Sequence, residues 1–261
     1  MQLKNARILV TGASGGIGQA IAHMMDRQGA HLLLAGRNQQ ALEQLKASLT
    51  GEHEIIIADQ NSPGGRDDIV SRCRQQGLDG FINSAGILDF NFYEQQDQEI
   101  IEKILRTNLI SPMFLCHSLI PLLKQKKGAL IVNIGSTFGS IGYPGFTAYC
   151  ASKFGLRGFT EALQRELADT SIKVLYLAPR ATRTGLNSSA VTSLNVALGN
   201  ATDPPEDVAK HLLAMLSKQQ IQRFMGWPER IFVGINSLFP RVVHNALVKK
   251  LPVIRQHIEN K

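Results

Sequence analysis

Arg7-Ile8-Leu9-Val10-Thr11-Gly12-Ala13-Ser14-Gly15-Gly16-Ile17-Gly18 runs from an apolar, β-branched segment directly into a glycine-rich turn. The nearly unbroken apolar run over 7–11 predicts a strand buried on both faces, because a half-exposed strand would alternate polar and apolar residues. After the turn, apolar residues recur at helical spacing and predict a helix over 17–28. Strand, tight turn and helix in this order predict the opening of a βαβ unit.

The same alternation continues along the chain and predicts the fold class. Further strands are expected over 31–35, 54–58, 80–83, 129–134 and 173–178. Helices are expected over 39–49, 67–76, 97–126 with a break around 107–112, 149–168 and 205–217. This pattern predicts an α/β protein with a doubly wound, Rossmann-like parallel sheet flanked by helices, which is a three-layer α/β/α sandwich.

Length and composition narrow the class of protein. The 261 residues and 44% hydrophobic content predict one packed domain over 1–261, with 222–261 as a basic amphipathic appendage. No apolar run approaches the ~18 residues of a membrane span, and the first residues carry no secretory signal, so a cytoplasmic protein is expected. Cys73, Cys116 and Cys150 fit neither a metal site nor a disulfide framework. The net charge of +7 lies mostly near the C-terminus without any nucleic-acid-binding motif, so nucleic acid is not an expected partner.

The glycines of the first turn have a functional and a structural interpretation. Gly12, Gly16 and Gly18 stand in the spacing G-x-x-x-G-x-G. Such glycines let the backbone approach a pyrophosphate, which the amides and dipole of the helix N-terminus would hold. A sharp turn without a ligand would use the same residues. The position between an apolar strand and an amphipathic helix favours a dinucleotide site.

Arg37 follows the second predicted strand, where enzymes that use NAD(H) usually present a carboxylate to the ribose hydroxyls. A carboxylate would repel a 2′-phosphate, whereas Arg37 would bind it through bidentate, charge-assisted hydrogen bonds. The alternative is an exposed arginine at a helix start, where a cation is slightly unfavourable. The sequence therefore predicts NADP(H) in preference to NAD(H).

Several further motifs occur in a characteristic order. They are Thr11-Gly12-x-x-x-Gly16-x-Gly18, Asp59, Asn83-Ser84-Ala85-Gly86, Thr107-Asn108-Leu109, Ser136, Tyr149-x-x-x-Lys153 and the run from Pro179 to Thr184. On these motifs the chain resembles the short-chain dehydrogenase/reductase family over about residues 6–217. The resemblance implies an oxidoreductase that moves a hydride between NADP(H) and a small-molecule carbonyl or alcohol. It places Asn108, Ser136, Tyr149 and Lys153 at the catalytic centre.

Tyr149 and Lys153 predict proton-transfer chemistry from their residue types alone. Four residues apart on a predicted helix, their side chains share a face, with Cβ atoms ~5–6 Å apart. A phenol has a pKa of ~10, and lowering it by ~3 units requires ~4 kcal/mol of preferential stabilisation of the phenolate. The Lys153 ammonium, together with a positive nicotinamide ring, is the expected source. Tyr149 would exchange a proton with the substrate oxygen, which Ser136 would orient.

The family resemblance implies further roles. Lys153 would also hold the nicotinamide ribose, Asn108 would belong to a water relay, and Asp59 would bind the adenine amino group. Asn108 could instead cap or interrupt a helix, and Asp59 could be only a turn residue. The expected cofactor contacts are Gly12, Ser14, Gly16, Ile17, Gly18, Arg37, Asp59, Asn83, Ala85, Gly86, Tyr149, Lys153, Pro179, Thr182 and Thr184.

Two residues depart from the family pattern. Ser84 stands where a second Asn is usual, and Arg180 replaces the Gly that usually follows Pro179. The Arg180 side chain is expected to point into the pocket or onto a phosphate.

The substrate-binding region is less clearly marked. The segment 185–203 lacks clear periodicity and is expected to be a mobile loop over the substrate. An apolar or acyl-chain ketone or aldehyde is the favoured substrate. The alternative function is a non-enzymatic NADP(H)-binding sensor or scaffold, although the presence of both Tyr149 and Lys153 favours an enzyme. Candidates for an apolar pocket wall, or equally for ordinary packing, are Phe90, Phe92, Tyr143, Phe146 and Leu186.

The C-terminal segment is longer than in compact members of the family. Residues 223–226 are expected to supply a last short strand. Apolar residues then recur at helical spacing from Ile231 to Leu247, with Arg241, Lys249 and Lys250 nearby. A basic amphipathic segment of this kind can lie on an anionic membrane, and the alternative is packing on its own subunit or a partner. The helices over 109–126 and 149–168 are apolar enough for the helix-pair interface that the family resemblance implies, so a homodimer or homotetramer is expected.

Overall fold

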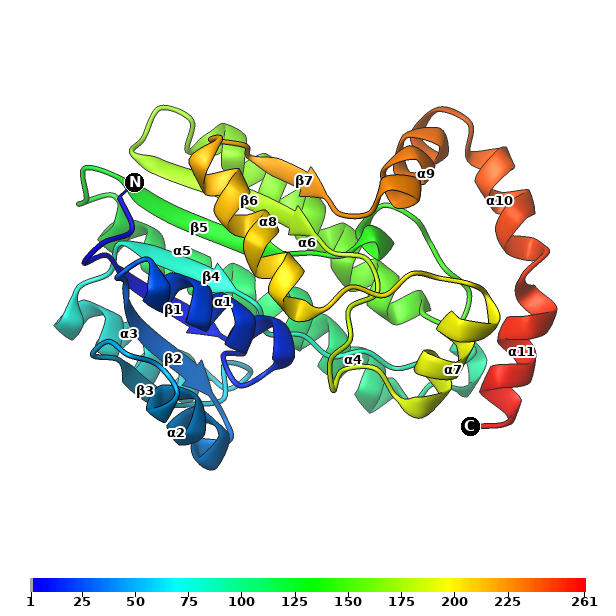
Figure 1. Ribbon diagram of the computed structural model, residues 1–261, viewed down its shortest axis with the longest axis horizontal. Helices are drawn as coiled ribbons and strands as arrows, with labels where there is room; N and C mark the ends of the chain where they lie inside the picture. The colour runs from blue at the N-terminus through cyan, green and yellow to red at the C-terminus, as the bar shows by residue number, and fades with distance from the viewer. Residues whose placement is uncertain (1) are drawn as a thin grey trace.

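Parallel strands form one sheet in the order β3-β2-β1-β4-β5-β6-β7 in the computed structural model, which describes residues 2–261 (Figure 1). The strand order reverses at β1, so the crevice at the carboxyl ends of β1 and β4 is the expected ligand site. The predicted doubly wound, Rossmann-like sheet is confirmed. The strands are β1 (Arg7–Thr11), β2 (His31–Gly36), β3 (Glu54–Ile57), β4 (Gly80–Asn83), β5 (Ala129–Ile134), β6 (Ile172–Ala178) and β7 (Gln222–Phe224).

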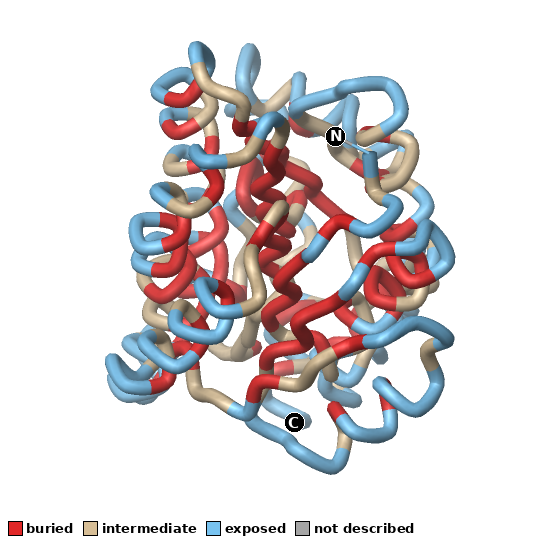
Figure 2. Tube along the Cα trace, turned by 90° about the vertical axis from the view of Figure 1, so that its left-hand side faces the viewer, coloured by how far each residue is buried: buried red, intermediate tan, exposed pale blue. Residues whose placement is uncertain are grey.

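Helices cover both faces of the sheet. Ile8 and Val10 of β1 pack in one apolar cluster with side chains of α1, α2 and α8, whereas Leu9 packs in a second cluster with α3, α5 and α6. Alternate residues of a strand point to opposite faces, so a strand covered on both sides must be apolar throughout. Figure 2 shows the buried residues concentrated along the central strands. These helices are α1 (Gly16–Arg27), α2 (Gln39–Ala47), α3 (Pro63–Gln76), α5 (Ser111–Leu123), α6 (Thr147–Glu166) and α8 (Pro205–Ser217).

Two helix predictions need correction at their boundaries. The helix α3 starts at Pro63 rather than at residue 67, because Ser62 accepts a hydrogen bond from the amide of Gly65 and caps the helix there. The predicted break around 107–112 is a wider, π-helical turn, η2 (Arg106–Ile110), that joins α4 (Gln98–Leu105) to α5. The chain therefore stays helical through this region, and such turns are frequent at functional sites.

The prediction of a segment 185–203 without regular structure is wrong. This segment contains α7 (Ser189–Ala197), whose first turn is capped by Ser188 accepting from the amide of Val191 at 3.3 Å. Val191 and Leu194 are buried in a cluster with Ile254 and Ile258 from the C-terminal helix α11 (Leu251–Glu259). Packing against a distant part of the chain gives this short helix its apolar support.

The C-terminal segment begins with β7 at the edge of the sheet and continues as α9 (Trp227–Leu238), α10 (Pro240–Val248) and α11. Val233 of α9 and Val243 of α10 are buried against Ile141. One face of the segment therefore packs on its own subunit, as the second alternative predicted. In the described chain no single helix is long and apolar enough to span a membrane, whereas α9 and α10, bent by 120°, pass that test only as a pair.

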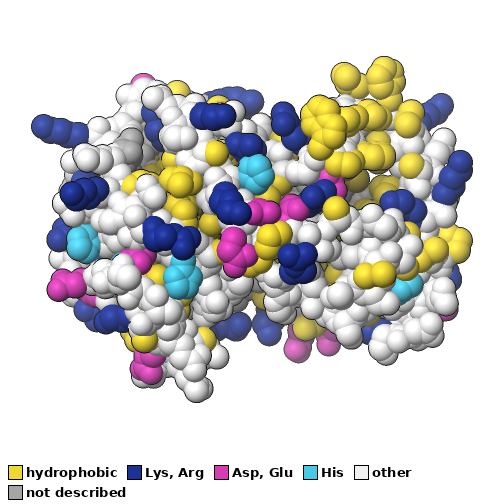
Figure 3. Space-filling model, in the orientation of Figure 1, with side chains coloured by type: hydrophobic (Ala, Val, Ile, Leu, Met, Phe, Trp, Pro, Cys, Tyr) yellow, Lys and Arg dark blue, Asp and Glu magenta, His cyan; other side chains and the backbone are white. Residues whose placement is uncertain are grey.

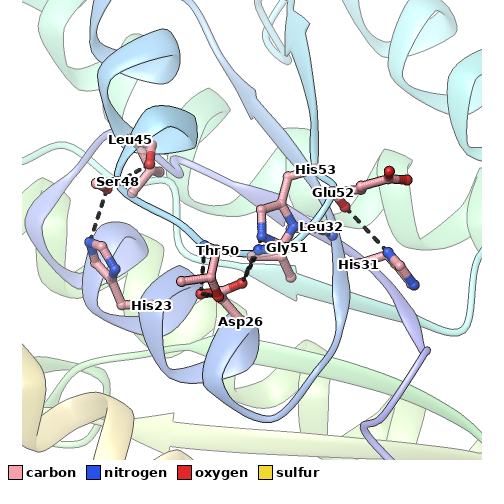
Figure 4. A network of polar contacts seen from close by, with 10 residues as sticks. All are labelled: His23, Asp26, His31, Leu32, Leu45, Ser48, Thr50, Gly51, Glu52 and His53. Carbon is pink, nitrogen blue, oxygen red and sulfur yellow. Dashed lines mark hydrogen bonds and ion pairs between the residues drawn. The ribbon is translucent and has the colours of Figure 1, made fainter.

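A buried hydrogen bond between His53 and Asp26 fixes the loop that leads into β3 (Figure 4). The Nε2 atom of His53 lies 2.9 Å from Oδ1 of Asp26, and Nδ1 of His53 accepts from the amide of Leu32 at 3.1 Å. Since Nδ1 accepts, the ring proton sits on Nε2 and is donated to Asp26. Burial raises the pKa of Asp26, but hydrogen bonds from Thr50, Gly51 and His53 outweigh it and lower the pKa to about 2.

Candidate active site

Two cavities open at the carboxyl ends of the strands. The glycine-loop cavity, of about 260 Å³, lies beside the turn after β1. Six of the predicted cofactor residues line it, which are Gly12, Ser14, Arg37, Asp59, Ala85 and Gly86. Asn83 does not line either cavity: its side chain is buried in the sheet, where it lies 3.3 Å from Oδ1 of Asn133. The tyrosine cavity, of about 440 Å³, lies in front of β5 and β6.

The glycines of the turn are required by close backbone contacts. Gly12 has a φ of +64°, and a Cβ on it would lie 2.6 Å from the Cα of Ala85. A Cβ on Gly18 would overlap the carbonyl oxygen of Gly12. Within the described helix α1, the first turn carries no acidic side chain and the N-cap Gly15 makes no side-chain hydrogen bond. The start of this helix therefore faces the cavity with the charge preference of an anion site.

The glycine-loop cavity is lined by polar groups that suit a dinucleotide. Arg37 makes no hydrogen bond or ion pair with any residue that the structure describes, and it precedes the helix cap Asn38. The Oγ atom of Ser84 is buried and has no hydrogen-bond partner within residues 2–261. Asp59 accepts from the amide of Asn61 at 3.0 Å, so it also serves as the turn residue that the alternative predicted. An unpaired cation and an unsatisfied buried hydroxyl fit a phosphorylated ribose.

Asn108 is fully buried beside the loop after β4. Its Oδ1 accepts from the amide of Ile87 at 2.9 Å, while its Nδ2 donates to the carbonyl oxygen of Ile87 at 2.8 Å and to Ser152 at 3.0 Å. A Cβ on Gly86 would lie 3.4 Å from Asn108 Oδ1 and 3.7 Å from Lys153 Nζ. The π-helical turn thus places the Asn108 side chain in the interior, where it clamps the loop after β4 beside Lys153.

Ser136 and Tyr149 both line the tyrosine cavity. Ser136 follows β5 and accepts from the amide of Phe138 at 3.1 Å, which orients its hydroxyl oxygen. Tyr149 lies near the start of α6 and is 8% exposed. Burial raises the pKa of Tyr149 to about 12, although a hydrogen bond with Ser136 acts in the opposite direction. In the chain alone the phenol is therefore protonated at neutral pH, whereas the lowered pKa was predicted with a positive nicotinamide ring beside it.

Lys153 is buried one helical turn after Tyr149. Its Nζ donates to the carbonyl oxygen of Ile134 at 3.0 Å. Burial lowers the pKa of Lys153 to about 8, because the charged form is desolvated. The ammonium reaches the end of β5 from beneath the site and does not line either cavity.

Tyr176 is a supporting residue that the sequence analysis did not identify. Its hydroxyl donates to the carbonyl oxygen of Ser136 at 3.4 Å. A Cβ on Gly139 would lie 2.5 Å from this hydroxyl, and one on Gly135 would overlap the ring. Gly135 and Gly139, on either side of Ser136, therefore let the turn lie directly on Tyr176. The two glycines around the predicted serine were the sequence signal that a bulky side chain packs against this turn.

Several of the remaining predicted cofactor residues line the tyrosine cavity. Ile17, Pro179, Thr182 and Thr184 line it, and a Cβ on Gly16 would lie 2.8 Å from Cγ2 of Thr184. The turn before α1 and the loop after β6 are therefore in close contact. The predicted residues thus line both cavities, with Arg37 at the first and Tyr149 at the second.

Arg180 lines the tyrosine cavity, as one of the two alternatives predicted, and its guanidinium binds carboxylates there. It donates to both carboxylate oxygens of Asp203, at 2.9 and 2.8 Å, and lies 3.4 Å from the carboxylate of Glu229. These contacts raise the pKa of the guanidinium, with the Asp203 hydrogen bonds contributing most. The residue that replaces the family glycine thus connects the loop after β6 to the segment before α8 and to α9.

The wall of the tyrosine cavity is mainly apolar. Of the five predicted wall residues, Tyr143, Phe146 and Leu186 line it. Phe90 instead stacks behind Phe146 with ring centroids 4.9 Å apart, and Phe92 packs under the guanidinium of Arg255 at 4.7 Å, so these two are packing residues. The helices α7, α9 and α10 supply further lining residues that the sequence analysis did not assign, namely Val191, Leu194, Phe232, Val243, Ala246 and Leu247.

The chain is similar to several known proteins. A family model described as short chain dehydrogenase matches residues 6–195. A nodulation protein G of Rhizobium sp. is 34% identical over 196 residues, which are 73% of this chain and 77% of the relative. A 3-oxoacyl-(acyl-carrier-protein) reductase FabG of Chlamydia pneumoniae is 30% identical over 85% of this chain and 93% of its own. The crystal structure of a short-chain dehydrogenase from Streptomyces avermitilis superimposes with a TM-score of 0.80 at 25% identity, covering 97% of this chain and 98% of that one.

Proposed function

This chain belongs to the short-chain dehydrogenase family of oxidoreductases, and we propose that it uses NADP(H) to interconvert a carbonyl group and an alcohol. The observation that carries the proposal is the position of Tyr149 and Ser136 together on an apolar cavity, with Lys153 buried behind them. A phenol and a hydroxyl on one cavity wall can both reach the oxygen of a single substrate.

We propose the following contacts for the cofactor, which the family takes as NAD(P)(H). The turn residues Gly12, Ser14, Gly16, Ile17 and Gly18 would receive the pyrophosphate at the start of α1. When bound, the nicotinamide ring supplies or accepts the hydride. Preference for NADP(H) is supported by the unpaired Arg37 at the end of β2. The other proposed contacts are Asp59, Ala85 and Gly86 around the adenosine, and Tyr149, Lys153, Pro179, Thr182 and Thr184 around the nicotinamide.

Tyr149 is proposed to donate its phenolic proton to the carbonyl oxygen in reduction, and to accept it back in oxidation. The raised pKa of about 12 supports the donor role, because it keeps the proton on the phenol until a substrate arrives. Ser136 would hold the same oxygen, with its own hydroxyl fixed by the amide of Phe138. Lys153 would supply positive charge, and Asn108 would keep the loop after β4 in register beside it.

An apolar or acyl-chain ketone or aldehyde is the proposed substrate. Side chains from four helices give the tyrosine cavity its apolar wall, and its volume of about 440 Å³ lies in the range of small-molecule sites. The FabG relative, named for reduction of a 3-oxoacyl group, supports the same chemical class. A sugar substrate would require more polar side chains on this wall.

We propose the assembly and location on separate grounds. Exposed apolar side chains on α5 and α6, including Met113, Phe114 and Phe154, support a homodimer or homotetramer through these helices. We retain a single domain over 1–261, with 222–261 as its appendage. A cytoplasmic protein that touches the inner face of a membrane through this appendage is the proposed location.

The function is tested by following NADPH consumption with a panel of aliphatic ketones and aldehydes. We expect turnover by the natural chain and a loss of at least about 100-fold in kcat for Tyr149→Phe. The dissociation constant for NADPH should stay within about twofold, since Phe keeps the ring and removes only the hydroxyl. Binding of NADPH without turnover across the panel would instead assign the chain to the class of sensors.

A further inference from the structure

The helices α9 and α10 each have one group of side chains that lines the tyrosine cavity and another group that faces solvent. Phe232, Val243 and Leu247 line the cavity from these helices. On the outer side of α9, Trp227, Ile231 and Leu238 follow helical spacing and are 72%, 46% and 75% exposed. Phe239 and Val242 extend this apolar surface to α10 with exposures of 64% and 57%. We call these five exposed residues the outer apolar face.

Figure 3 shows the largest group of apolar side chains on that side of the molecule over α9 and α10, and smaller apolar groups elsewhere. Single exposed apolar residues are normal on a protein surface, but a contiguous group usually covers something. The cavity-lining side chains and the outer apolar face belong to the same two helices, so whatever covers the face contacts the helices that form this wall of the cavity.

The charges around the outer apolar face indicate an anionic partner. Residues 230–258 contain no Asp or Glu, while Arg230, Arg241 and Lys249 lie on or beside α9 and α10 and are exposed. The acidic residue of α9, Glu229, is paired with Arg180. An apolar surface with exposed cations and no free carboxylate matches the acyl chains and phosphates at the boundary of an anionic membrane.

The geometry favours lying on the membrane surface. At 1.5 Å per residue, α9 and α10 are about 18 and 14 Å long, each well short of the ~30 Å hydrocarbon core. The 120° bend between them prevents a straight crossing by the pair. Two short amphipathic helices that pack one face on the protein can lie in the headgroup region, with the opposite face directed toward the acyl chains.

We propose that the outer apolar face docks on an anionic lipid surface and that the tyrosine cavity exchanges an apolar carbonyl or alcohol with that surface between α9 and α10. The proposal rests on the proposed function for the identity of the reacting group, but docking itself does not. The proposed substrates are therefore molecules that partition into lipid. Because α9 and α10 form part of the apolar cavity wall and also face the membrane, such molecules would have a direct path from the lipid to the cavity.

The test measures vesicle binding and turnover separately, with the full-length chain loaded with NADPH. We expect the natural chain to co-float with phosphatidylcholine vesicles that contain phosphatidylserine, and at least tenfold less with phosphatidylcholine alone. The double variant Leu238→Ser/Phe239→Ser should lose this binding at least tenfold. The matched control Ile221→Ser, which removes a 53% exposed apolar side chain away from the helix pair, should bind as the natural chain does.

Turnover distinguishes docking from substrate exchange. The double variant should reduce a water-soluble ketone at the natural rate and a vesicle-borne long-chain ketone at least tenfold more slowly. Equal rates on the vesicle-borne ketone would overturn the exchange. Absence of vesicle binding by the natural chain would overturn docking. A change of oligomeric state in the double variant would also overturn docking, because it would show that a second copy of the chain covers the outer apolar face. Lack of turnover on every carbonyl would contradict the proposed function and leave the binding result intact.

Discussion

The ammonium nitrogen of Lys153 lies 5.8 Å from the centre of the Tyr149 ring, with both side chains almost fully buried. Burial acts on the two groups in opposite directions, lowering the pKa of Lys153 to about 8 and raising that of Tyr149 to about 12. Each shift favours the neutral form. At neutral pH the lysine is therefore mostly charged and the phenol protonated, which is the state required to protonate a carbonyl oxygen.

The first prediction concerns the pH dependence of carbonyl reduction. Lys153 is charged below its pKa of about 8, so kcat/KM should be highest below this pH and fall as the lysine loses its proton above it. Lys153→Arg, provided that it folds, should keep a charge throughout and move this decline to higher pH. The check is a profile of kcat/KM from pH 6 to pH 10. A natural enzyme with a flat profile across this window would contradict the assignment.

The second prediction concerns cofactor choice. Arg37→Ala should raise KM for NADPH at least about tenfold, because a hydrogen bond to a charged group is worth about 1.5–3 kcal/mol. KM for NADH should change little, since NADH has no 2′-phosphate. Arg27→Ala removes another exposed arginine, at the far end of α1, and serves as the control. Similar kcat/KM values for both cofactors in the natural enzyme would argue against the preference.

The third prediction concerns Arg180. Arg180→Gly restores the residue usual in the family but leaves the carboxylates of Asp203 and Glu229 without their cation. We expect a loss of about 1–3 kcal/mol in the free energy of unfolding, and faster amide exchange across α9. The measurements are urea denaturation and hydrogen exchange by mass spectrometry. Arg183→Gly is the control, because that exposed arginine contacts only the carbonyl oxygen of Thr202. Unchanged exchange in α9 would show that the ion pairs do not hold the helix.

The fourth prediction concerns Asp26. Its pKa of about 2 in the folded chain is below the ordinary 3.8, so the ionised form stabilises the fold above about pH 4 and this stabilisation is lost as the pH falls toward 2. Above pH 5 the natural chain should exceed Asp26→Asn by about 2 kcal/mol in the free energy of unfolding. The difference should shrink by about 1 kcal/mol at pH 3. Urea denaturation at several pH values provides the measurement, and a difference independent of pH would refute the shift.

The fifth prediction compares two glycines with opposite surroundings. Gly18→Ala should cost about 1–3 kcal/mol, because its Cβ would overlap the Gly12 carbonyl oxygen. Gly64→Ala lies in the first turn of α3 with no atom within 4 Å of the new Cβ, and it should stabilise the chain by about 0.5–1 kcal/mol. Thermal unfolding of both variants checks the contrast, which would fail if the two shifts had the same sign.

Much of the sheet could be predicted because its strands are short apolar runs between glycines and polar residues. Strands β1, β4 and β5 have the expected boundaries, and β2, β3 and β6 differ by one residue at one end. A strand buried on both faces carries this signal in its own sequence. Pairing partners are fixed in turn by the rule that successive parallel strands need crossover helices.

The parts that could not be predicted depend on contacts between distant segments. The helix α7 has only a short apolar stripe within a Ser- and Asn-rich region, and its packing partner α11 lies more than 50 residues later. The two carboxylates around Arg180 come 23 and 49 residues after it, so its side-chain direction is not encoded locally. Likewise, a raised pKa at Tyr149 follows from burial, which residue spacing alone does not report.

The parallel order of the sheet also constrains how the chain reaches its native state. Thr11 of β1 pairs with Ala35 of β2 on one side and with Asn83 of β4 on the other, and the second partner is 72 residues away. No strand can be stabilised by a neighbouring hairpin, so every pairing must first overcome the entropy of closing a long loop. During synthesis β1 therefore keeps an open edge until β4 has emerged. We expect slow refolding and a dependence of yield on temperature and chaperones, as for other nascent chains with late long-range pairing.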